Sequence, residues 1–256
     1  MQSIAPMDHS IDLIPIPIYV CIMAKIRNKA VAPTSGPDTS RKERLLAASL
    51  DVFGRLGFDG ASTRQLADAA GVNLQAIPYY FSSKEGLYIA TAEYLTQMIS
   101  DHVGDLRQKI EIRIAEPETS GGALEPTEAR VLLTDIAQMM ITLFVSKKSE
   151  SWARFIIREQ MEPTEAFSRV YDGIMRPMIE IARRLVATIL EDDPASEQVR
   201  LRTLSFVGSI LVYRVAHAAV LAQMEWKNAG PDEIVTLRRF AAELVSALGP
   251  ERRVPA

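Results

Sequence analysis

Residues 62–84, STRQLADAAGVNLQAIPYYFSSK, decide the fold because they predict two short helices joined by a tight turn. Ser62 and Gln65 have the spacing of a capping box, which begins a helix. Gly71 stands where a helix-ending residue adopts the left-handed conformation, and Asn73 is placed to cap a second helix over residues 74–81. Such a pair is typical of a helix-turn-helix, whose second helix enters the DNA major groove, although a simple helical hairpin has the same spacing.

The flanking sequence favours the helix-turn-helix. Residues 45–56 place apolar side chains on one face of a helix: Leu45, Leu46, Val52, Phe53 and Leu56. The stretch from Leu45 to Leu87 resembles the DNA-binding domain of the TetR family of bacterial transcriptional regulators. The matching motifs are Leu45-Leu46-x-Ala48, Phe53, Gly57-Phe58-x-Gly60, Ser62, Leu66-Ala67, Ala70-Gly71-Val72, Tyr79-x-Phe81 and Lys84-Glu85-x-Leu87.

This resemblance implies an all-α protein in two parts. The N-terminal part is a three-helix helix-turn-helix DNA-binding domain, which we assign to residues 41–86. A larger helical domain for effector binding and dimerisation follows, over residues 87–250.

The resemblance also implies which side chains contact DNA. The start of the second helix reads base edges, so the base-facing candidates are Asn73, Leu74, Gln75 and Ala76. Gln75 can bond an adenine edge through two hydrogen bonds, and Leu74 or Ala76 can contact a thymine methyl. The phosphate-facing candidates are Arg64, Tyr79, Tyr80 and Lys84, with Ser83 and the N-terminus of the next helix adding backbone N–H groups.

Four positions near the end of the second helix need separate comment. Tyr79 has an alternative place in the small three-helix core, and for Phe81 the core position is the expected one. Tyr80 replaces the histidine that is common in the family, which puts its phosphate contact in doubt. Pro78 stands where the family often has an aromatic residue, and it should shorten or bend the helix.

Composition and charge describe an ordinary globular protein with a mildly basic head. At 256 residues, with 48% hydrophobic and 24% charged residues, the chain is long enough to bury a core. Residues 23–84 hold nine Lys and Arg against five Asp and Glu, whereas residues 85–256 hold twenty against twenty-five. This asymmetry is typical of a DNA-contacting module joined to a non-contacting one. The single cysteine, Cys21, excludes an internal disulfide and favours a reducing, cytoplasmic compartment.

Residues 1–40 are expected to be a flexible tail or the product of a start site assigned too early, with Met23 as the true initiator. The apolar run from Ile11 to Met23 is interrupted by charge and proline and is shorter than the ~20 residues that span a bilayer. It therefore predicts neither a signal peptide nor a membrane anchor. Residues 32–40 are rich in turn formers and predict a linker. The basic residues nearby form either a DNA-contacting arm or a solvated tail: Lys25, Arg27, Lys29, Arg41, Lys42 and Arg44.

The rest of the chain shows no period-two alternation and predicts only helices. These cover about residues 83–110, 151–161, 164–190, 201–224 and 232–248, with a further helix starting at Pro126 after a loop at 116–125. Pro177 lies inside one of them and predicts a kink around residues 173–177. The helix over 201–224 is apolar almost all round and should be covered on most sides, while Arg214 and His217 within it disfavour a membrane span. This excess apolar surface suggests a homodimer, and the TetR resemblance implies a four-helix bundle of the two C-terminal helices with their symmetry mates.

A second resemblance, over about residues 151–217, is to the C-terminal domain of the CecR-like (YbiH-like) branch of the family. It rests on Arg154-Phe155-x-x-Arg158-Glu159-Gln160, Pro163, Ala166-Phe167, Met175-Arg176-Pro177-Met178, Gly208 and Tyr213-Arg214. It implies a ligand-responsive regulator, whose partners are double-stranded operator DNA and an unspecified small-molecule effector.

We expect the effector pocket between the helix of residues 152–161, the kink at 173–177, and residues 213–217. Aromatic and Met side chains can line an adaptable apolar cavity there, and an Arg or His anchor would favour an anionic ligand. The candidate effector-binding residues are Phe155, Arg158, Phe167, Tyr171, Met178, Arg214 and His217. As alternatives, Arg154, Arg158 and Glu162 form a solvated ion-paired face, and His217 is an ordinary core histidine.

The sequence predicts no enzyme, no metal site and no cofactor. His9, His102 and His217 share no metal-ligand spacing, and Cys21 has no plausible basic partner. Neither a glycine-rich phosphate loop nor a Gly-x-Ser-x-Gly motif is present. The rivals to a ligand-responsive repressor are therefore a constitutive DNA-binding or bridging protein without an effector, and a helical interaction scaffold.

Overall fold

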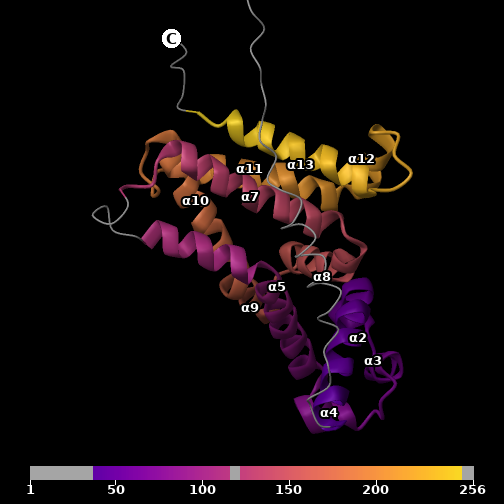
Figure 1. The fold of residues 1–256 in the computed structure, drawn as a ribbon. Coiled ribbons are helices and arrows are strands. Elements are labelled where there is room, and N and C mark those ends of the chain that lie inside the picture. The colour runs from indigo at the N-terminus through magenta and orange to yellow at the C-terminus, as the bar shows by residue number, and fades with distance from the viewer. Residues whose placement is uncertain (1–36, 116–121, 250–256) are drawn as a thin grey trace, which may run out of the picture. The chain divides into compact units, whose positions relative to one another are not determined.

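The computed structural model describes residues 37–115 and 122–249, and every regular element in these two ranges is helical (Figure 1). In chain order the elements are α2 (Pro37–Gly60), α3 (Thr63–Ala70), α4 (Ala76–Phe81), α5 (Lys84–Ala115), α7 (Pro126–Val145), the 3₁₀ turn η1 (Lys147–Ser149), α8 (Glu150–Met161), α9 (Glu165–Val170), the π-helical turn η2 (Tyr171–Met175), α10 (Arg176–Leu190), α11 (Glu197–Val215), α12 (His217–Gln223) and α13 (Pro231–Ser246). The predicted all-α class is confirmed. The expectations for residues 1–36, including those for His9, Cys21, Lys25, Arg27 and Lys29, lie outside the described ranges.

The first described helix begins earlier than the sequence analysis predicts. α2 starts at Pro37, inside the stretch predicted to be a linker, and proline is well tolerated at a helix start because its missing N–H needs no partner there. Its helical geometry breaks at Gly57, where φ is 76° and ψ is 178°. Leu56 was predicted on the buried face but is 41% exposed, because the helix breaks one residue later and leaves that side uncovered.

Two hydrophobic cores lie in the compact unit that begins at Lys42. The first joins the helix-turn-helix to α5, α8 and α9, since Phe53 and Leu66 share one buried cluster with Phe155 and Val170. The second lies where α7 packs on α10, α11 and α13, and of these helices α7, α11 and α13 run side by side in Figure 1. The core of the helix-turn-helix is therefore shared with the rest of the chain, and α8 and α9 complete it.

The interruption predicted at Pro177 takes the form of a π-helical turn. The N–H of Arg176 bonds to the carbonyl of Tyr171, five residues back, at the end of η2. Pro177 has no N–H to donate to the carbonyl of Gly173, so the regular α-helical ladder cannot run through this point. Gly173 also lets α5 approach closely, because a Cβ there would lie 2.5 Å from Thr96 Cγ2.

The helix predicted over residues 201–224 is in fact two helices. α11 ends at Val215, and α12 follows after a bend of 83°. A continuous helix would pair the carbonyl of Tyr213 with the N–H of His217, but this carbonyl lies 3.3 Å from His217 Nδ1. No described helix is by itself long and apolar enough to cross a membrane; two bent pairs, α7 with α8 and α11 with α12, pass that test of length and composition when joined.

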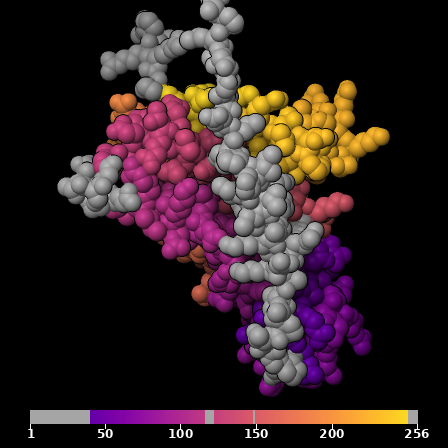
Figure 2. Space-filling view, viewed as in Figure 1, coloured from indigo at the N-terminus to yellow at the C-terminus, as the bar shows by residue number. Residues whose placement is uncertain are grey.

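Residues 37–115 and 122–249 do not supply the predicted cover over most sides of α11. Its inner face, with Phe206 and Ile210, packs on α7 and α10, whereas the outer face is exposed. The exposed apolar side chains of α11 are Leu201, Leu204, Leu211, Val212 and Val215. The α12–α13 segment, coloured orange to yellow in Figure 2, also lies on the molecular surface.

Candidate nucleic-acid interface

The first helix of the helix-turn-helix, α3, begins with the capping box that the sequence predicts. Ser62 Oγ accepts a hydrogen bond from the N–H of Gln65 at 3.2 Å, and Gln65 Oε1 accepts one from the N–H of Ser62 at 2.8 Å. Gly71 ends the helix with φ 61° and ψ 40°, and its N–H bonds to the carbonyl of Asp68 at 3.1 Å. These local hydrogen bonds direct the chain into the turn and confirm the predicted start and end of α3.

The recognition helix, α4, begins two residues later than predicted. Asn73 Oδ1 accepts the N–H of Gln75 at 2.9 Å, yet the regular helix starts only at Ala76. Pro78 is the cause, because it has no N–H to donate to the carbonyl of Leu74, which bonds instead to the N–H of Ile77 at 3.3 Å. The first turn is therefore 3₁₀-like, and α4 is only six residues long, as the proline led us to expect.

The side chains assigned to base reading lie at the solvent-facing start of this helix. Asn73, Leu74 and Gln75 are exposed and Ala76 is half-buried, whereas Ile77 is 1% exposed in the head's core. The exposed set combines two side-chain amides, those of Asn73 and Gln75, with the apolar side chain of Leu74 between them. The Asn73 oxygen already accepts the N–H of Gln75, which leaves the Gln75 amide as the one without such a local bond. That combination suits an adenine edge next to a thymine methyl, and the base contacts themselves stay a prediction.

The phosphate candidates differ in how strongly the head already holds them. Tyr79 is 74% exposed, so its alternative place in the core is wrong, whereas Phe81 at 9% exposure lies in the core as expected. Arg64 is exposed, and Tyr80 is half-buried with its ring centroid 4.8 Å from that of Tyr79. The ammonium of Lys84 lies 4.4 Å from the centroid of the Phe58 ring, so any phosphate contact must compete with this cation–π contact.

The N-terminus of α5 has the geometry expected of a phosphate site, but an acidic side chain already uses it. Ser83 Oγ caps the helix by accepting the N–H of Gly86 at 3.1 Å. Hydrogen bonds from the backbone N–H of Glu85 and from the Ser83 side chain hold the pKa of the Glu85 carboxyl below its ordinary value. A phosphate approaching this helix end would therefore share the favourable helix dipole with a carboxylate.

Two of the candidate effector residues lie at the junction of α8 with the head. Phe155 is 1% exposed, and its ring centroid lies 5.1 Å from that of Tyr88 of α5. Arg158 lies against the end of α2, where a Cβ on Gly57 would be 2.8 Å from Arg158 Nη1. Both side chains are therefore part of the packing between α8 and the DNA-binding head.

Three more candidates lie on α9, η2 and α10. The rings of Phe167 and Tyr171 stack with centroids 5.4 Å apart and an interplanar angle of 18°. The guanidinium of Arg176 lies 5.1 Å from the centroid of the Tyr171 ring and pairs with Asp172 at 2.7 Å. Met178 is half-buried and packs against both hydrophobic cores.

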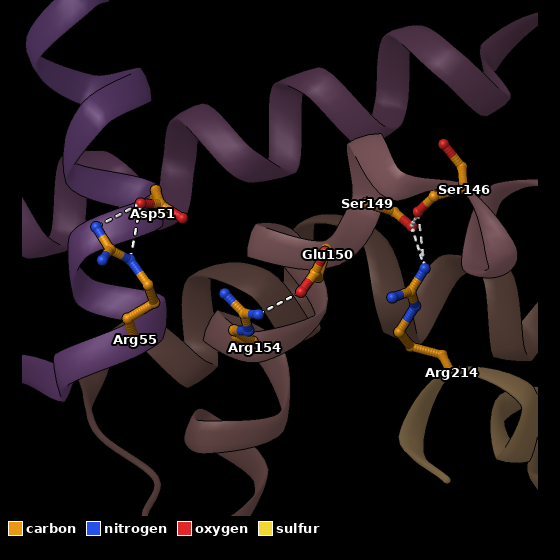
Figure 3. Close-up of polar contacts among 7 residues, drawn as sticks. All are labelled: Asp51, Arg55, Ser146, Ser149, Glu150, Arg154 and Arg214. Atoms are coloured by element: carbon orange, nitrogen blue, oxygen red, sulfur yellow. Dashed lines mark hydrogen bonds and ion pairs between the residues drawn. The ribbon is translucent and has the colours of Figure 1, made fainter. Parts of the chain in front are cut away.

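Arg214 of α11 holds the connection between α7 and α8 (Figure 3). Its Nη2 donates to the carbonyl of Ser146 at 2.7 Å and to Ser149 Oγ at 3.1 Å. Burial lowers the pKa of the Arg214 guanidinium from its ordinary value, and Glu150 opposes this shift. In the same view Arg154 pairs with Glu150, four residues earlier on α8. His217, the last candidate, is half-buried at the α11–α12 break.

Two cavities lie near the C-terminal end of α5, apart from these seven side chains. The first, of about 540 Å³, is lined by Ile114, Leu124, Arg184, Ala187, Thr188 and residues 191–194. The second, of about 640 Å³, is lined by Asp105, Gln108, Lys109, Ile112, Arg113, Glu128, Val131 and Leu132. Both are shallow hollows that lie open to solvent, and neither includes a candidate effector residue. Within the described ranges, no three His, Cys, Asp or Glu side chains are grouped to hold a metal ion.

The sequence analysis missed one contact between head and body. Tyr88 of α5 and Glu159 of α8 are hydrogen-bonded although 71 residues separate them. Glu159 appeared only as part of a motif, and Tyr88 was not singled out. The sequence does contain one sign of this contact. Glu159 stands four positions after the apolar Phe155 and so lies on the same, buried face of its helix.

The capped helix α3, the exposed recognition helix α4 and the helical body define a helix-turn-helix DNA-binding protein. The model of bacterial regulatory proteins of the tetR family matches residues 45–91, and that of the C-terminal domain of the HTH-type transcriptional dual regulator CecR matches residues 129–250. The HTH-type transcriptional dual regulator CecR of Shigella flexneri is 32% identical over 185 residues, which is 72% of this chain and 80% of that protein. The chain belongs to the TetR family of DNA-binding transcriptional regulators and carries a CecR-type C-terminal domain.

Other relatives agree with this assignment. The HTH-type transcriptional regulator RutR of Escherichia coli K12 is 42% identical over 62 residues, or 24% of this chain and 29% of that protein. The crystal structure of AibR in complex with isovaleryl coenzyme A and operator DNA has a TM-score of 0.57 at 12% identity, covering 80% of this chain and 97% of that one. HlyIIR, a hemolysin II transcriptional regulator, has a TM-score of 0.55 at 14% identity, with 84% and 99% covered. At these identities the two structures show a shared fold.

Proposed function

We propose that this chain is a ligand-responsive repressor that binds a pseudo-palindromic operator as a homodimer. Residues 41–86 serve as the DNA-binding domain and residues 87–250 as the effector-binding and dimerisation domain. The observation that carries the proposal is the exposed apolar surface of α11 and α13. A two-fold dimer presents two recognition helices to two half-sites, which is why the operator should be a pseudo-palindrome.

Two C-terminal helices expose several large apolar side chains. On α11 these include Leu201, Leu204 and Val215, each at least 55% exposed, and on α13 they include Val235 at 64% and Phe240 at 44%. Where exposed apolar side chains together form a large patch, the patch marks an interaction site. Packing against the same helices of a second copy would remove these side chains from water. Each Å² of apolar surface buried in this way would stabilise the dimer by about 25 cal/mol.

One charge substitution on α11 tests the dimer. Leu204→Glu should give a monomer in sedimentation velocity and lose affinity for a full operator, because a carboxylate would be buried without a partner. Val131→Glu, at a position of α7 that is 56% exposed, is the matched control and should remain a dimer. If Leu204→Glu sediments like the unchanged protein, this surface is not the dimer interface.

The operator itself can be found by selecting bound DNA from a random pool. We expect two inverted half-sites separated by about one helical turn or a multiple of it. Repeating the selection with a library of small molecules identifies the effector as the compound that releases the DNA. A single, non-repeated binding motif would contradict the homodimer proposal even if the protein binds DNA tightly.

The effector assignment rests on the CecR-like resemblance and on relatives with bound ligands. AibR was crystallised with isovaleryl coenzyme A and operator DNA, and FadR of Bacillus subtilis with stearoyl-CoA. We propose that Phe167, Tyr171 and Met178 contribute apolar contacts to an effector and that the cationic candidates favour an anionic ligand. Tyr171→Ala should then abolish effector release while sparing operator affinity, since a ligand acts only by binding one state of the protein better than another. Unchanged effector potency in this variant would place the effector elsewhere.

A constitutive DNA-binding protein without an effector is the second candidate. The observation in its favour is that neither cavity includes any of the seven candidate effector residues. Phe155 and Arg214 also have packing and hydrogen-bonding partners that account for them without a ligand. This alternative predicts that no compound in the library changes the selected DNA.

A further inference from the structure

The buried contact between Tyr88 and Glu159 crosses from the helix that carries the head to the body. The Tyr88 hydroxyl donates to Glu159 Oε1 at 2.5 Å. The other oxygen, Oε2, accepts the backbone N–H of Thr164 at 3.1 Å and its hydroxyl at 2.9 Å. Thr164 is the cap of α9, where its Oγ1 also accepts the N–H of Ala166. One carboxylate thus joins α5, α8 and α9 at a single point.

Glu159 is an unusual residue for this position. It is 2% exposed and lies next to the first hydrophobic core, where a carboxylate is costly unless its oxygens are hydrogen-bonded. Its three donors meet that requirement. Burial and the neighbouring Glu159 raise the pKa of the Tyr88 hydroxyl far above its ordinary value, so Tyr88 stays protonated and remains a donor. Hydrogen bonds to a charged acceptor are stronger and more demanding in geometry than neutral ones.

The ring of Tyr88 also has a defined place. It meets Phe53 edge-on at 4.7 Å and Phe58 at 5.2 Å, both from α2, and Phe155 of α8 at 5.1 Å. These rings by themselves allow sliding, because apolar contacts are not directional. A directional bond at the tip of one ring removes this freedom.

The end of α2 packs closely against α8, through the backbone at Gly54 and through a side chain at Gly57. A Cβ on Gly54 of α2 would lie 3.0 Å from the carbonyl oxygen of Ser151 of α8, and a Cβ on Gly57 would be 2.8 Å from Arg158 Nη1. The end of α2 is therefore in direct contact with both the first turn of α8 and the residue next to Glu159. A shift of α8 at this point must move α2, α5 or both.

We infer that the Tyr88–Glu159–Thr164 relay positions the DNA-binding head, so that its hydrogen bonds hold α3 and α4 at one orientation relative to the α8–α9 corner. Tyr88 and Glu159 are positioning residues that do not touch DNA. Because the orientation of each head decides the distance between recognition helices in a dimer, the relay also sets the operator spacing. The consequence for operator spacing rests on the proposed homodimer, whereas the positioning within one chain does not.

The first test measures head orientation without DNA. Cys21 is replaced by Ser, and spin labels are attached at Ala69→Cys on α3 and Val131→Cys on α7, which are both exposed positions. Diluting labelled chains with unlabelled ones leaves only the distance between the two labels of one chain. Tyr88→Phe keeps the ring and removes only the hydroxyl. We expect its distance distribution to broaden, with a second orientation gaining roughly 10-fold or more in population, as the loss of a hydrogen bond to a charged group implies.

Two further variants make the result decisive. Tyr94→Phe, the same change on a half-buried tyrosine of the same helix, should keep the narrow distribution of the unchanged protein. Glu159→Gln keeps the side-chain volume but turns an amide donor toward either Thr164 or Tyr88, and it should broaden the distribution as Tyr88→Phe does. If both relay variants fold and give the unchanged distribution, the relay does not position the head, even if their melting temperatures fall.

The second test uses operators in which the two half-sites are moved apart one base pair at a time. The unchanged protein and Tyr94→Phe should prefer one spacing, whereas Tyr88→Phe should accept neighbouring spacings with a smaller penalty and bind an isolated half-site equally well. An unchanged spacing preference in Tyr88→Phe overturns the inference. If the unchanged protein shows no spacing preference at all, the homodimer proposal fails, and the distance measurement alone decides the role of the relay.

Discussion

Gly86 offers a sharp test of how the recognition helix is joined to α5. A Cβ at this position would lie 2.0 Å from the carbonyl oxygen of Phe81, the last residue of α4. This distance is far inside van der Waals contact, and the opposing atom belongs to the backbone, so it cannot rotate away. Gly86→Ala must therefore open the turn between α4 and α5.

The magnitude follows from two opposing terms. Overpacking of a tight site costs ~1–3 kcal/mol, and a backbone clash belongs at the upper end of that range. Alanine returns at most ~1 kcal/mol through its better helix propensity. We therefore expect Gly86→Ala to lower the free energy of unfolding by about 2 kcal/mol and to weaken operator binding, because α4 moves with the turn.

Gly104 is the matched control on the same helix. Nothing lies within 4 Å of a Cβ placed there, so Gly104→Ala should raise the free energy of unfolding by ~0.5–1 kcal/mol. Both variants can be compared with the unchanged protein by urea unfolding followed by circular dichroism at one protein concentration, which removes the effect of association. The reasoning is refuted if Gly86→Ala is as stable as the unchanged protein, or if both glycine variants shift stability in the same direction.

Three further predictions follow from the head and the body. Gln75→Ala should relax base preference at one position of each half-site by about 1–3 kcal/mol, measured by competition between operator variants. An unchanged preference would mean that Gln75 does not read a base. Lys84→Ala should weaken binding to all DNA sequences alike and reduce by about one the slope of the logarithm of the binding constant against the logarithm of the salt concentration. A slope equal to that of the unchanged protein would mean that Lys84 only packs on Phe58. Burial raises the pKa of Asp135, against the opposing charges of Lys109 and Arg238, so its carboxyl group binds a proton more tightly in the folded than in the unfolded protein. The contribution of this group to the free energy of unfolding is therefore lost as the pH rises through the folded pKa. Asp135→Asn should therefore gain stability relative to the unchanged protein between acidic and neutral pH in denaturation curves, and a constant difference across that interval would contradict the shift.

The start and end of α3 were predictable because they depend on hydrogen bonds between residues close in sequence. Ser62 and Gln65 are three positions apart, and Gly71 closes its helix through the carbonyl of Asp68. The shortening of α4 by Pro78 is local for the same reason, since a missing N–H affects only the carbonyls three or four residues back. Helical periodicity likewise identified Phe53 as a core residue, and the TetR motif led us to expect Phe81 there.

Features that depend on which helices meet were not accessible in this way. Periodicity placed Leu56 on a buried face and predicted cover over most sides of residues 201–224. The exposure of Leu56 and Leu204 is instead decided by which of the described helices pack against them. The sequence also separated head from body at residue 86, whereas the core that contains Phe53 is completed by α8 and α9. Tyr88 and Glu159 are 71 positions apart, and no local pattern pairs a phenol with a carboxylate over that separation. Short-range hydrogen bonds and helical periodicity could therefore be predicted from the sequence alone. Which helix covers each buried face is decided only in the tertiary structure, because packing depends on surfaces that folding brings together.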